Sequence, residues 1–272
     1  MDILCGDGLG VCTGPALSCR GVGEDGRMPH PDHAAGAPAA PQPAVPLSDD
    51  SPVVLDRRDG PFGEVVLRRH AGRHEIIANG CFLMDTSDGR SERLLVDCAL
   101  DALDAPAGPR SGLRLLIGGL GVGFSLARAA AEPRWGEIAV VERETAVVDW
   151  HRSGPLAAYS AHALDDPRVR VVEADLVGYV RDAETRFDAL CLDIDNGPDW
   201  TVTENNGTLY SLSGLVACRE RLEPAGVLAV WSAQPSTRFE AALRDAGFTG
   251  VRTLEVPVTR GVPDVVHVGV KA

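Results

Sequence analysis

The stretch Leu113-Arg-Leu-Leu-Ile-Gly-Gly-Leu-Gly-Val-Gly-Phe124 decides the fold of this chain. A run of aliphatic residues ends in a cluster of glycines, and a helix-like stretch over residues 125–131 follows directly. A strand, a glycine-rich turn and a helix in this order allow a backbone to approach a ligand closely. A second aliphatic run ends in Glu142, where a nucleotide-binding α/β sheet places the carboxylate that holds ribose hydroxyls. The sequence therefore predicts an adenosine-containing cofactor bound by Glu142 and by the glycines of the turn, Gly118, Gly119, Gly121 and Gly123.

The composition is ordinary for a globular protein, with 272 residues, 44% of them hydrophobic, and a net charge of −13. So acidic a chain disfavours contacts with phosphates, and we expect no nucleic-acid partner. No run approaches the ~20 apolar residues of a membrane span, and the start has no signal-peptide pattern, so we expect no membrane association. The seven cysteines form no Cys-x-x-Cys pair. This predicts no disulfide framework, no metal site and a cytoplasmic location.

Three segments differ in character along the chain. Residues 1–50 are rich in Gly, Ala and Pro, which predicts a disordered tail. Residues 51–105 predict an antiparallel β unit followed by a helix, with strands near 63–69, 74–78 and 81–84 and the helix over 92–103. Asn79-Gly80 is a strong hairpin signal within this unit. Residues 106–272 predict the cofactor-binding domain.

Strand and helix patterns alternate from residue 113 onward. Strands are expected at 113–118, 137–142, 169–173, 187–193 and 226–232, with helical stretches between them. This alternation predicts a mostly parallel sheet with helices on both faces. The end differs, because 251–258 and 265–270 read as two strands without a helix between them. A doubly wound Rossmann-like sheet with a closing antiparallel hairpin resembles class I methyltransferase folds.

Carboxylates follow several of the predicted parallel strands. Glu142 ends the second strand, Asp175 follows the third, and Asp193 and Asp195 follow the fourth. Open α/β sheets bind ligands at the carboxyl ends of their strands, so these side chains are expected to face one ligand. Asp193 and Asp195 are the candidate catalytic groups, because an attacking amine must lose a proton. Turn formation is the plain alternative for both.

Two aromatic residues downstream are candidates for a substrate pocket. Trp200 and Tyr210 could place an aromatic face toward a cationic acceptor. Packing in the core or at the rim is an equal alternative for each.

The chain resembles the spermidine synthase family over roughly residues 60 to 270. The resemblance rests on the glycine turn, Val141-Glu142, Asp193-Ile-Asp-Asn-Gly-Pro-Asp199 and Leu209-Tyr-Ser211. It implies that Glu142 holds the cofactor ribose and that Asp175 accepts from the adenine amino group. It also implies that Leu176 lines the adenine pocket, that Asp193 faces the substrate, and that the chain forms a homodimer.

The departures from the family pattern concern the groups that bind the amines. Gly121 stands where a typical member has an Asp that grips the aminopropyl amine, and Asn196 stands where the second catalytic carboxylate would lie. We assign Asn196 to the substrate site. Leu83 and Ser91-Glu-Arg-Leu-Leu95 replace the segments that contact the polyamine.

These features predict an S-adenosylmethionine-dependent transferase that alkylates a small-molecule acceptor, with methyl transfer as the first expectation. The open alternatives are aminopropyl transfer from decarboxylated S-adenosylmethionine to an amine, intramolecular cyclisation of the cofactor, and a non-catalytic nucleoside-binding module.

Overall fold

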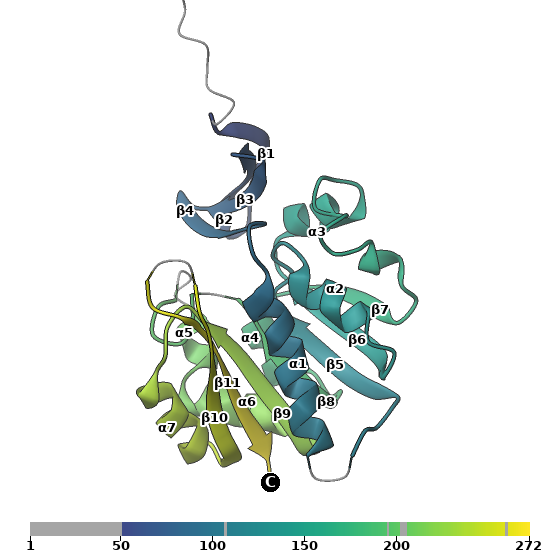
Figure 1. Ribbon diagram of the computed structural model, residues 1–272, viewed down its shortest axis with the longest axis vertical. Helices are drawn as coiled ribbons and strands as arrows, with labels where there is room; N and C mark the ends of the chain where they lie inside the picture. Colours follow the sequence, from purple (N-terminus) through teal and green to yellow (C-terminus); the bar gives the residue numbers. More distant parts are fainter. Residues whose placement is uncertain (1–50, 106–107, 195, 202–205, 259–260) are drawn as a thin grey trace, which may run out of the picture. The chain divides into compact units, whose positions relative to one another are not determined.

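The computed structural model describes residues 51–105, 108–194, 196–201, 206–258 and 261–272 (Figure 1). The tail predicted for residues 1–50 and the predicted catalytic Asp195 lie outside the described residues. Residues 46–272 form one compact unit. The domain boundary expected at residues 105–106 stays a prediction. Among the described residues, no helix is long and apolar enough to cross a membrane.

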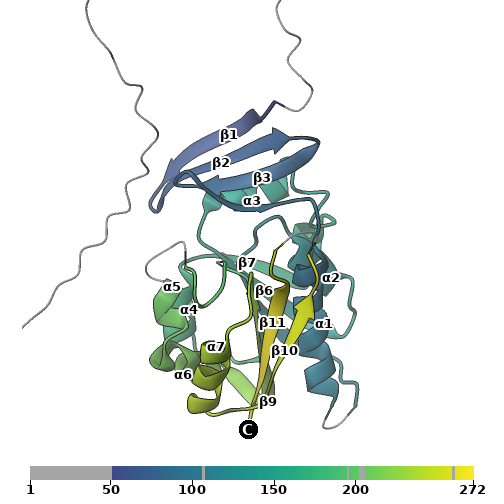
Figure 2. The same ribbon diagram turned by 60° about the vertical axis from the view of Figure 1, so that its left-hand side comes forward.

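The first part of this unit is a four-stranded antiparallel sheet (Figure 2). Its strands follow one another in space as in the sequence: β1 (Val53–Gly60), β2 (Gly63–His70), β3 (Arg73–Ala78) and β4 (Cys81–Asp85). Asn79 and Gly80 both have positive φ, at 50° and 77°, which is the tight hairpin geometry that the Asn-Gly pair favours. The sequence analysis missed β1, because the run of charges at residues 56–59 hides its alternation.

The main sheet has seven strands in the order β10-β11-β9-β8-β5-β6-β7. The chain enters this sheet at the central strand β5 and continues through β6 to β7 at one edge. It then crosses to the other side of β5 and adds β8, β9, β11 and β10, so the direction of strand addition reverses between β5 and β8. The parallel strands are β5 (Leu113–Gly118), β6 (Trp135–Glu142), β7 (Val169–Glu173), β8 (Phe187–Leu192) and β9 (Leu222–Ser232). Two antiparallel strands, β10 (Phe248–Val256) and β11 (Asp264–Lys271), close the sheet. The predicted fold class is confirmed.

Helices cover both faces of this sheet because its strands are buried on both sides (Figure 1). Alternate residues of β5 belong to different hydrophobic clusters, Leu115 and Ile117 to one and Leu116 to the other. The first cluster packs on α1 (Arg90–Asp104), α2 (Phe124–Ala130) and α3 (Thr145–Arg152), and it includes residues of the N-terminal sheet. The second packs on α4 (Leu176–Asp182), α6 (Leu212–Glu220) and α7 (Thr237–Asp245). A 3-10 turn (Ala163–Asp165) and a short helix, α5 (Asn206–Leu209), complete the described elements.

The register of the strands sets the position of the candidate site. Gly118 is the partner of Val141 on β6 and of Leu192 on β8. Glu142 and Asp193 each come one residue later, so they flank the glycine turn at the carboxyl edge of the sheet. The start of β11 reaches the same edge, because Val265 pairs with Ser232 at the end of β9.

Candidate functional site

The glycine turn packs closely on the protein's own backbone. Gly119, Gly121 and Gly123 have φ values of 91°, 49° and 94°. A Cβ on Gly119 would collide with the carbonyl oxygen of Asp193, and one on Gly118 would collide with Leu176. The glycines are therefore required by the contacts of the turn with the end of β8 and the start of α4, whether or not a ligand is bound.

Glu142 is fixed against this turn. Its side chain is buried, and Oε2 accepts a hydrogen bond from the backbone N–H of Leu120 at 2.9 Å. Oε1 accepts from the backbone N–H of Glu144 at 2.8 Å. A carboxylate has about four acceptor positions, so each oxygen keeps capacity for a ribose hydroxyl.

Asp175 and Leu176 begin α4 beside the turn. Oδ1 of Asp175 accepts from the backbone N–H of Gly178 at 2.9 Å, which caps the helix, while Oδ2 has no hydrogen bond from the described residues. Leu176 is buried and lies against Gly118. The structure thus brings together the residues predicted to hold a nucleoside, and their role toward a ligand stays a prediction.

Asp193 is partly buried on the other side of the turn, where its backbone N–H donates to the carbonyl of Gly118 at 2.9 Å. Burial raises the pKa of its carboxyl well above the ordinary value, and the negative charges of Glu92 and Asp264 raise it further. Glu92 lies in the first turn of α1, and Asp264 begins β11. We call Glu92, Asp193 and Asp264 the acidic cluster.

Ser91 links two members of the acidic cluster. Its Oγ lies 3.0 Å from Oε2 of Glu92 and 3.0 Å from Oδ2 of Asp264. Burial also raises the pKa of Glu92 and that of Asp264. One hydroxyl proton cannot satisfy two carboxylates fully, so this site favours a proton or a cation as an additional partner.

The predicted substrate residues lie in two different places. Asn196 is partly buried just beyond Asp193, and its backbone carbonyl accepts from the N–H of Ala233 at 3.0 Å. Trp200 is 61% exposed. Tyr210 is buried, packs edge-on against Phe239, and lines a small pocket of about 230 Å³ with Asp199 and Arg238.

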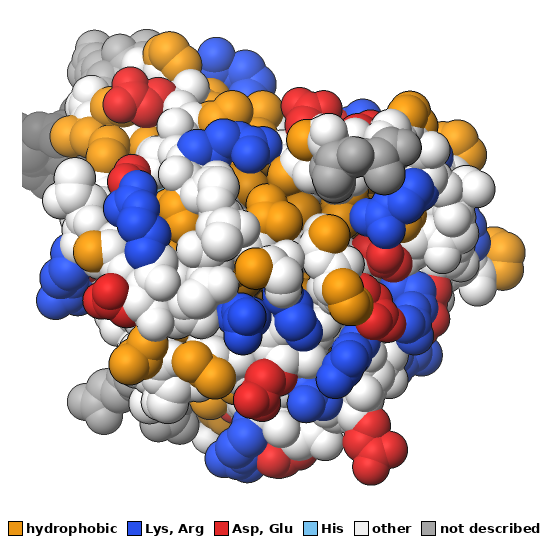
Figure 3. Space-filling model, turned by 90° about the horizontal axis from the view of Figure 1, so that it is seen from below, with side chains coloured by type: hydrophobic (Ala, Val, Ile, Leu, Met, Phe, Trp, Pro, Cys, Tyr) orange, Lys and Arg blue, Asp and Glu red, His pale blue; other side chains and the backbone are white. Residues whose placement is uncertain are grey.

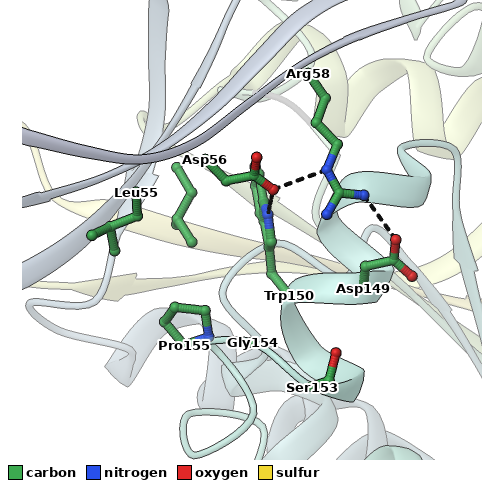
Figure 4. Close-up of a pocket in the computed structure, with 9 residues that line it drawn as sticks. Leu55, Asp56, Arg58, Asp149, Trp150, Ser153, Gly154 and Pro155 are labelled. Carbon is green, nitrogen blue, oxygen red and sulfur yellow. Dashed lines mark hydrogen bonds and ion pairs between the residues drawn. The ribbon is translucent and has the colours of Figure 1, made fainter.

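A larger pocket, of about 460 Å³, lies between β1 and α3 (Figure 4). Oδ2 of Asp56 accepts from Nε of Arg58 at 2.9 Å and from the indole N–H of Trp150 at 2.8 Å. Nη1 of Arg58 donates to Oδ2 of Asp149 at 2.8 Å. This network joins the N-terminal sheet to α3, and its charged groups are paired with one another.

The sequence analysis did not identify Glu92, Asp264 or Met84 as site residues. The sulfur of Met84 accepts from the backbone N–H of Val122 at 3.2 Å, and it occupies the space that a side chain on Gly121 would need. Glu92 could have been found from its position at a helix start, since helix N-termini favour acidic residues. No local pattern distinguishes Asp264 or Met84.

One face of the molecule carries charged side chains of both signs. On the face shown in Figure 3, Lys and Arg side chains are interspersed with Asp and Glu. Among the described residues, no group of His, Cys, Asp and Glu has an arrangement that could hold a metal ion.

Comparison with known proteins gives relatives of one kind. No family model matches the chain. The polyamine aminopropyltransferase of Mycobacterium tuberculosis is 28% identical over 204 residues, which cover 68% of this chain and 37% of that protein. Polyamine aminopropyltransferase 1 of Streptomyces coelicolor is 32% identical over 132 residues, which cover 48% of this chain and 24% of that protein.

The fold of the chain is also similar to that of a solved structure. The fold matches a spermidine synthase crystallised with the transition-state analogue AdoDATO, with a TM-score of 0.62, 18% identity, and coverage of 80% of this chain and 72% of that one. The resemblance to polyamine aminopropyltransferases is confirmed. The matched region covers only 37% of the length of the M. tuberculosis relative.

These similarities favour one alternative over the first expectation. The relatives are named for aminopropyl transfer, and methyl transfer finds no support among them.

Proposed function

We propose that this chain transfers an aminopropyl group from decarboxylated S-adenosylmethionine to an amine. The observation that carries the proposal is the acidic cluster of Glu92, Asp193 and Asp264 beside the glycine turn. Its carboxyls repel one another, and a cationic amine would relieve this repulsion. The aminopropyltransferases that resemble the chain support the same choice.

The donor would occupy the half of the site built on β5, β6 and α4. Glu142 keeps acceptor capacity for ribose hydroxyls, and Oδ2 of Asp175 has no partner among the described residues. Leu176 offers an apolar surface for an adenine ring. The residues present therefore suit an adenosyl group.

The reaction requires removal of one proton. The amine nitrogen of the acceptor attacks the methylene carbon next to the sulfonium, the carbon–sulfur bond breaks, and methylthioadenosine leaves. The new carbon–nitrogen bond places an extra proton on the nitrogen, and Asp193 accepts it. A raised pKa suits this role, because a base works best when its pKa approaches the operating pH.

Methyl transfer from S-adenosylmethionine is the second candidate. It is favoured by Gly121, which offers no carboxylate for an aminopropyl amine, and by the sulfur of Met84 that fills the space above it. The acidic cluster supplies negative charge from another side of the site, which is why aminopropyl transfer remains the first choice.

The test incubates the full chain with each sulfonium in turn and with a panel of diamines and polyamines. If the proposal is right, mass spectrometry would detect methylthioadenosine and an aminopropylated amine in the reactions that contain the decarboxylated donor and an amine, and in no reaction with S-adenosylmethionine. S-adenosylhomocysteine would instead indicate methyl transfer. Methylthioadenosine released without any amine would indicate cyclisation, and binding without turnover would indicate a nucleoside-binding module.

A homodimer is a further proposal for this chain. Strand β1 is at one edge of the N-terminal sheet, where Val53, Val54 and Leu55 are 47%, 50% and 40% exposed. Pairing with a second copy would bury this apolar edge. Light scattering after size exclusion should give twice the 28.7 kDa chain mass, and Val54→Lys should reduce it. A cytoplasmic location stays a prediction.

A further inference from the structure

A buried histidine lies directly under the glycine turn. His151, on α3, is 2% exposed, and its Nε2 is 2.9 Å from the carbonyl oxygen of Gly121. Its Nδ1 is 3.0 Å from Oγ of Ser160, which is itself fully buried. A Cβ on Gly123 would lie only 2.7 Å from Cε1 of the ring.

The partners of the ring define its tautomer. A carbonyl oxygen can only accept, so Nε2 carries the proton and donates it to Gly121. Burial lowers the pKa of His151, which favours the neutral ring. In the neutral ring Nδ1 is an acceptor. The hydroxyl of Ser160 lies within reach both of Nδ1, at 3.0 Å, and of the carbonyl oxygen of Ala157, at 3.1 Å, and it can donate to one of them at a time. A backbone hydrogen bond to Leu156 also contacts the ring and opposes the lowering of its pKa.

With the bond from His151 to Gly121, three consecutive residues of the turn each have a backbone group held by a side chain. The N–H of Leu120 is held by Glu142, the carbonyl of Gly121 by His151, and the N–H of Val122 by Met84. Glycine-rich backbone has many accessible conformations, so each of these bonds selects one of them. Releasing the middle carbonyl would also loosen Leu120, and through it the carboxylate of Glu142.

The helix that carries the histidine is anchored. Asp149 and Trp150, the two residues before it, bond to Arg58 and Asp56 of β1. The ring therefore projects from a helix that the N-terminal sheet holds in place.

We propose that His151 is a positioning residue for the donor nucleoside, and that it acts by fixing the carbonyl of Gly121. The inference rests on the proposed function, because it assumes that the glycine turn and Glu142 bind an adenosyl group. It assigns to the buried imidazole a role in donor affinity that is separable from folding.

The experiment compares His151→Leu, which fills similar volume without a donor, with His151→Gln, which keeps an N–H near Nε2. Calorimetric titration with methylthioadenosine is carried out well below the melting temperature of every variant. We expect the dissociation constant of His151→Leu to rise roughly 5- to 30-fold, as for loss of a buried hydrogen bond. His151→Gln should stay within about threefold of the wild type, since it keeps that bond. The KM for the sulfonium donor should follow the same order, with kcat changed less.

Ser160→Ala provides the second route if His151→Leu does not fold. It leaves the ring but removes the hydroxyl beside Nδ1, and we expect a smaller rise of roughly 2- to 5-fold. Imidazole ¹⁵N shifts should report an Nε2-protonated ring in the wild type and a mixture of tautomers in Ser160→Ala.

The two proposals fail in different ways. If the wild type binds methylthioadenosine and the Leu and Ala variants bind it equally well, the role of His151 is overturned while the proposed function stands. The same holds if His151→Gln is as weak as His151→Leu. If the wild type binds neither methylthioadenosine nor a sulfonium donor, the proposed function fails, and the inference fails with it.

Discussion

The two halves of the candidate site treat their carboxylates in opposite ways. On the donor side, Glu142 and Asp175 accept hydrogen bonds from backbone N–H groups, and the fold itself stabilises their charge. On the acceptor side, Glu92 and Asp264 share the hydroxyl of Ser91, and burial together with their negative charges raises the pKa of Asp193. The donor half is thus stable as it stands, whereas the acceptor half becomes favourable when a cation or proton enters.

The acceptor half therefore lowers the stability of the fold, whereas the donor half adds to it. A carboxylate bonded to backbone N–H groups contributes to folding, while buried carboxyls that repel one another oppose it. Substitutions in the two halves should therefore move activity together but stability in opposite directions.

The largest effect is expected for Asp193→Asn, which removes the proton acceptor at nearly constant shape. Turnover should fall by about 10²- to 10⁴-fold, as for loss of a general base. Affinity for methylthioadenosine should stay within about threefold, because the donor half is untouched. Initial rates and calorimetry measure both, with the exposed Asp182→Asn as a matched control. An unchanged rate would remove Asp193 from the mechanism.

Glu142→Gln tests the donor half. The amide keeps one acceptor oxygen but turns an N–H₂ group toward a backbone N–H, so one hydrogen bond is lost and the other loses its charge assistance. We expect methylthioadenosine affinity to fall about 10- to 100-fold and the protein to lose about 2 kcal/mol of stability. Calorimetry and urea denaturation check these values. Glu173→Gln, on the next strand, is the control and should change neither.

Gly121→Asp adds a carboxylate to the donor half, which makes this half more similar to the acceptor half. The new side chain must displace the sulfur of Met84, which should cost about 1–3 kcal/mol of stability by overpacking. The double variant Met84→Ala with Gly121→Asp should lose less than the sum of the two single changes. A denaturation cycle on the four proteins measures this coupling, and strict additivity would contradict the contact.

The smallest effect concerns the dependence of stability on pH. Because the pKa of Asp193 is raised on folding, the folded state keeps a proton that the unfolded state releases. Stability should therefore fall as pH rises from the ordinary carboxyl range through the raised pKa. Asp193→Asn removes this loss and should raise Tm by about 2–4 °C at neutral pH, the shift that roughly 1 kcal/mol produces at this size. Thermal scans from about pH 4 to 8 test it; a lower Tm for the variant at neutral pH would show that the cluster is not repulsive.

Much of the fold was accessible from local patterns. The aliphatic runs that became β5 and β8 are bounded by glycine or aspartate within one residue of the observed ends, because burial on both faces demands an uninterrupted apolar run. The hairpin at Asn79-Gly80 follows from backbone preferences alone. Strand β1 escaped detection since its charged residues pair with partners on other elements, such as Arg58 with Asp149.

Local sequence patterns were enough to predict the doubly wound sheet, the glycine turn and the placement of Glu142, Asp175 and Asp193 at strand ends. Each of these depends on neighbouring residues and on a strand period that local sequence carries. The packing of distant segments brings the charges of Glu92 and Asp264 to bear on Asp193, and it places His151 against the carbonyl of Gly121. Such meetings depend on strand order and helix packing, which no single segment encodes, because they arise when distant apolar faces are buried together.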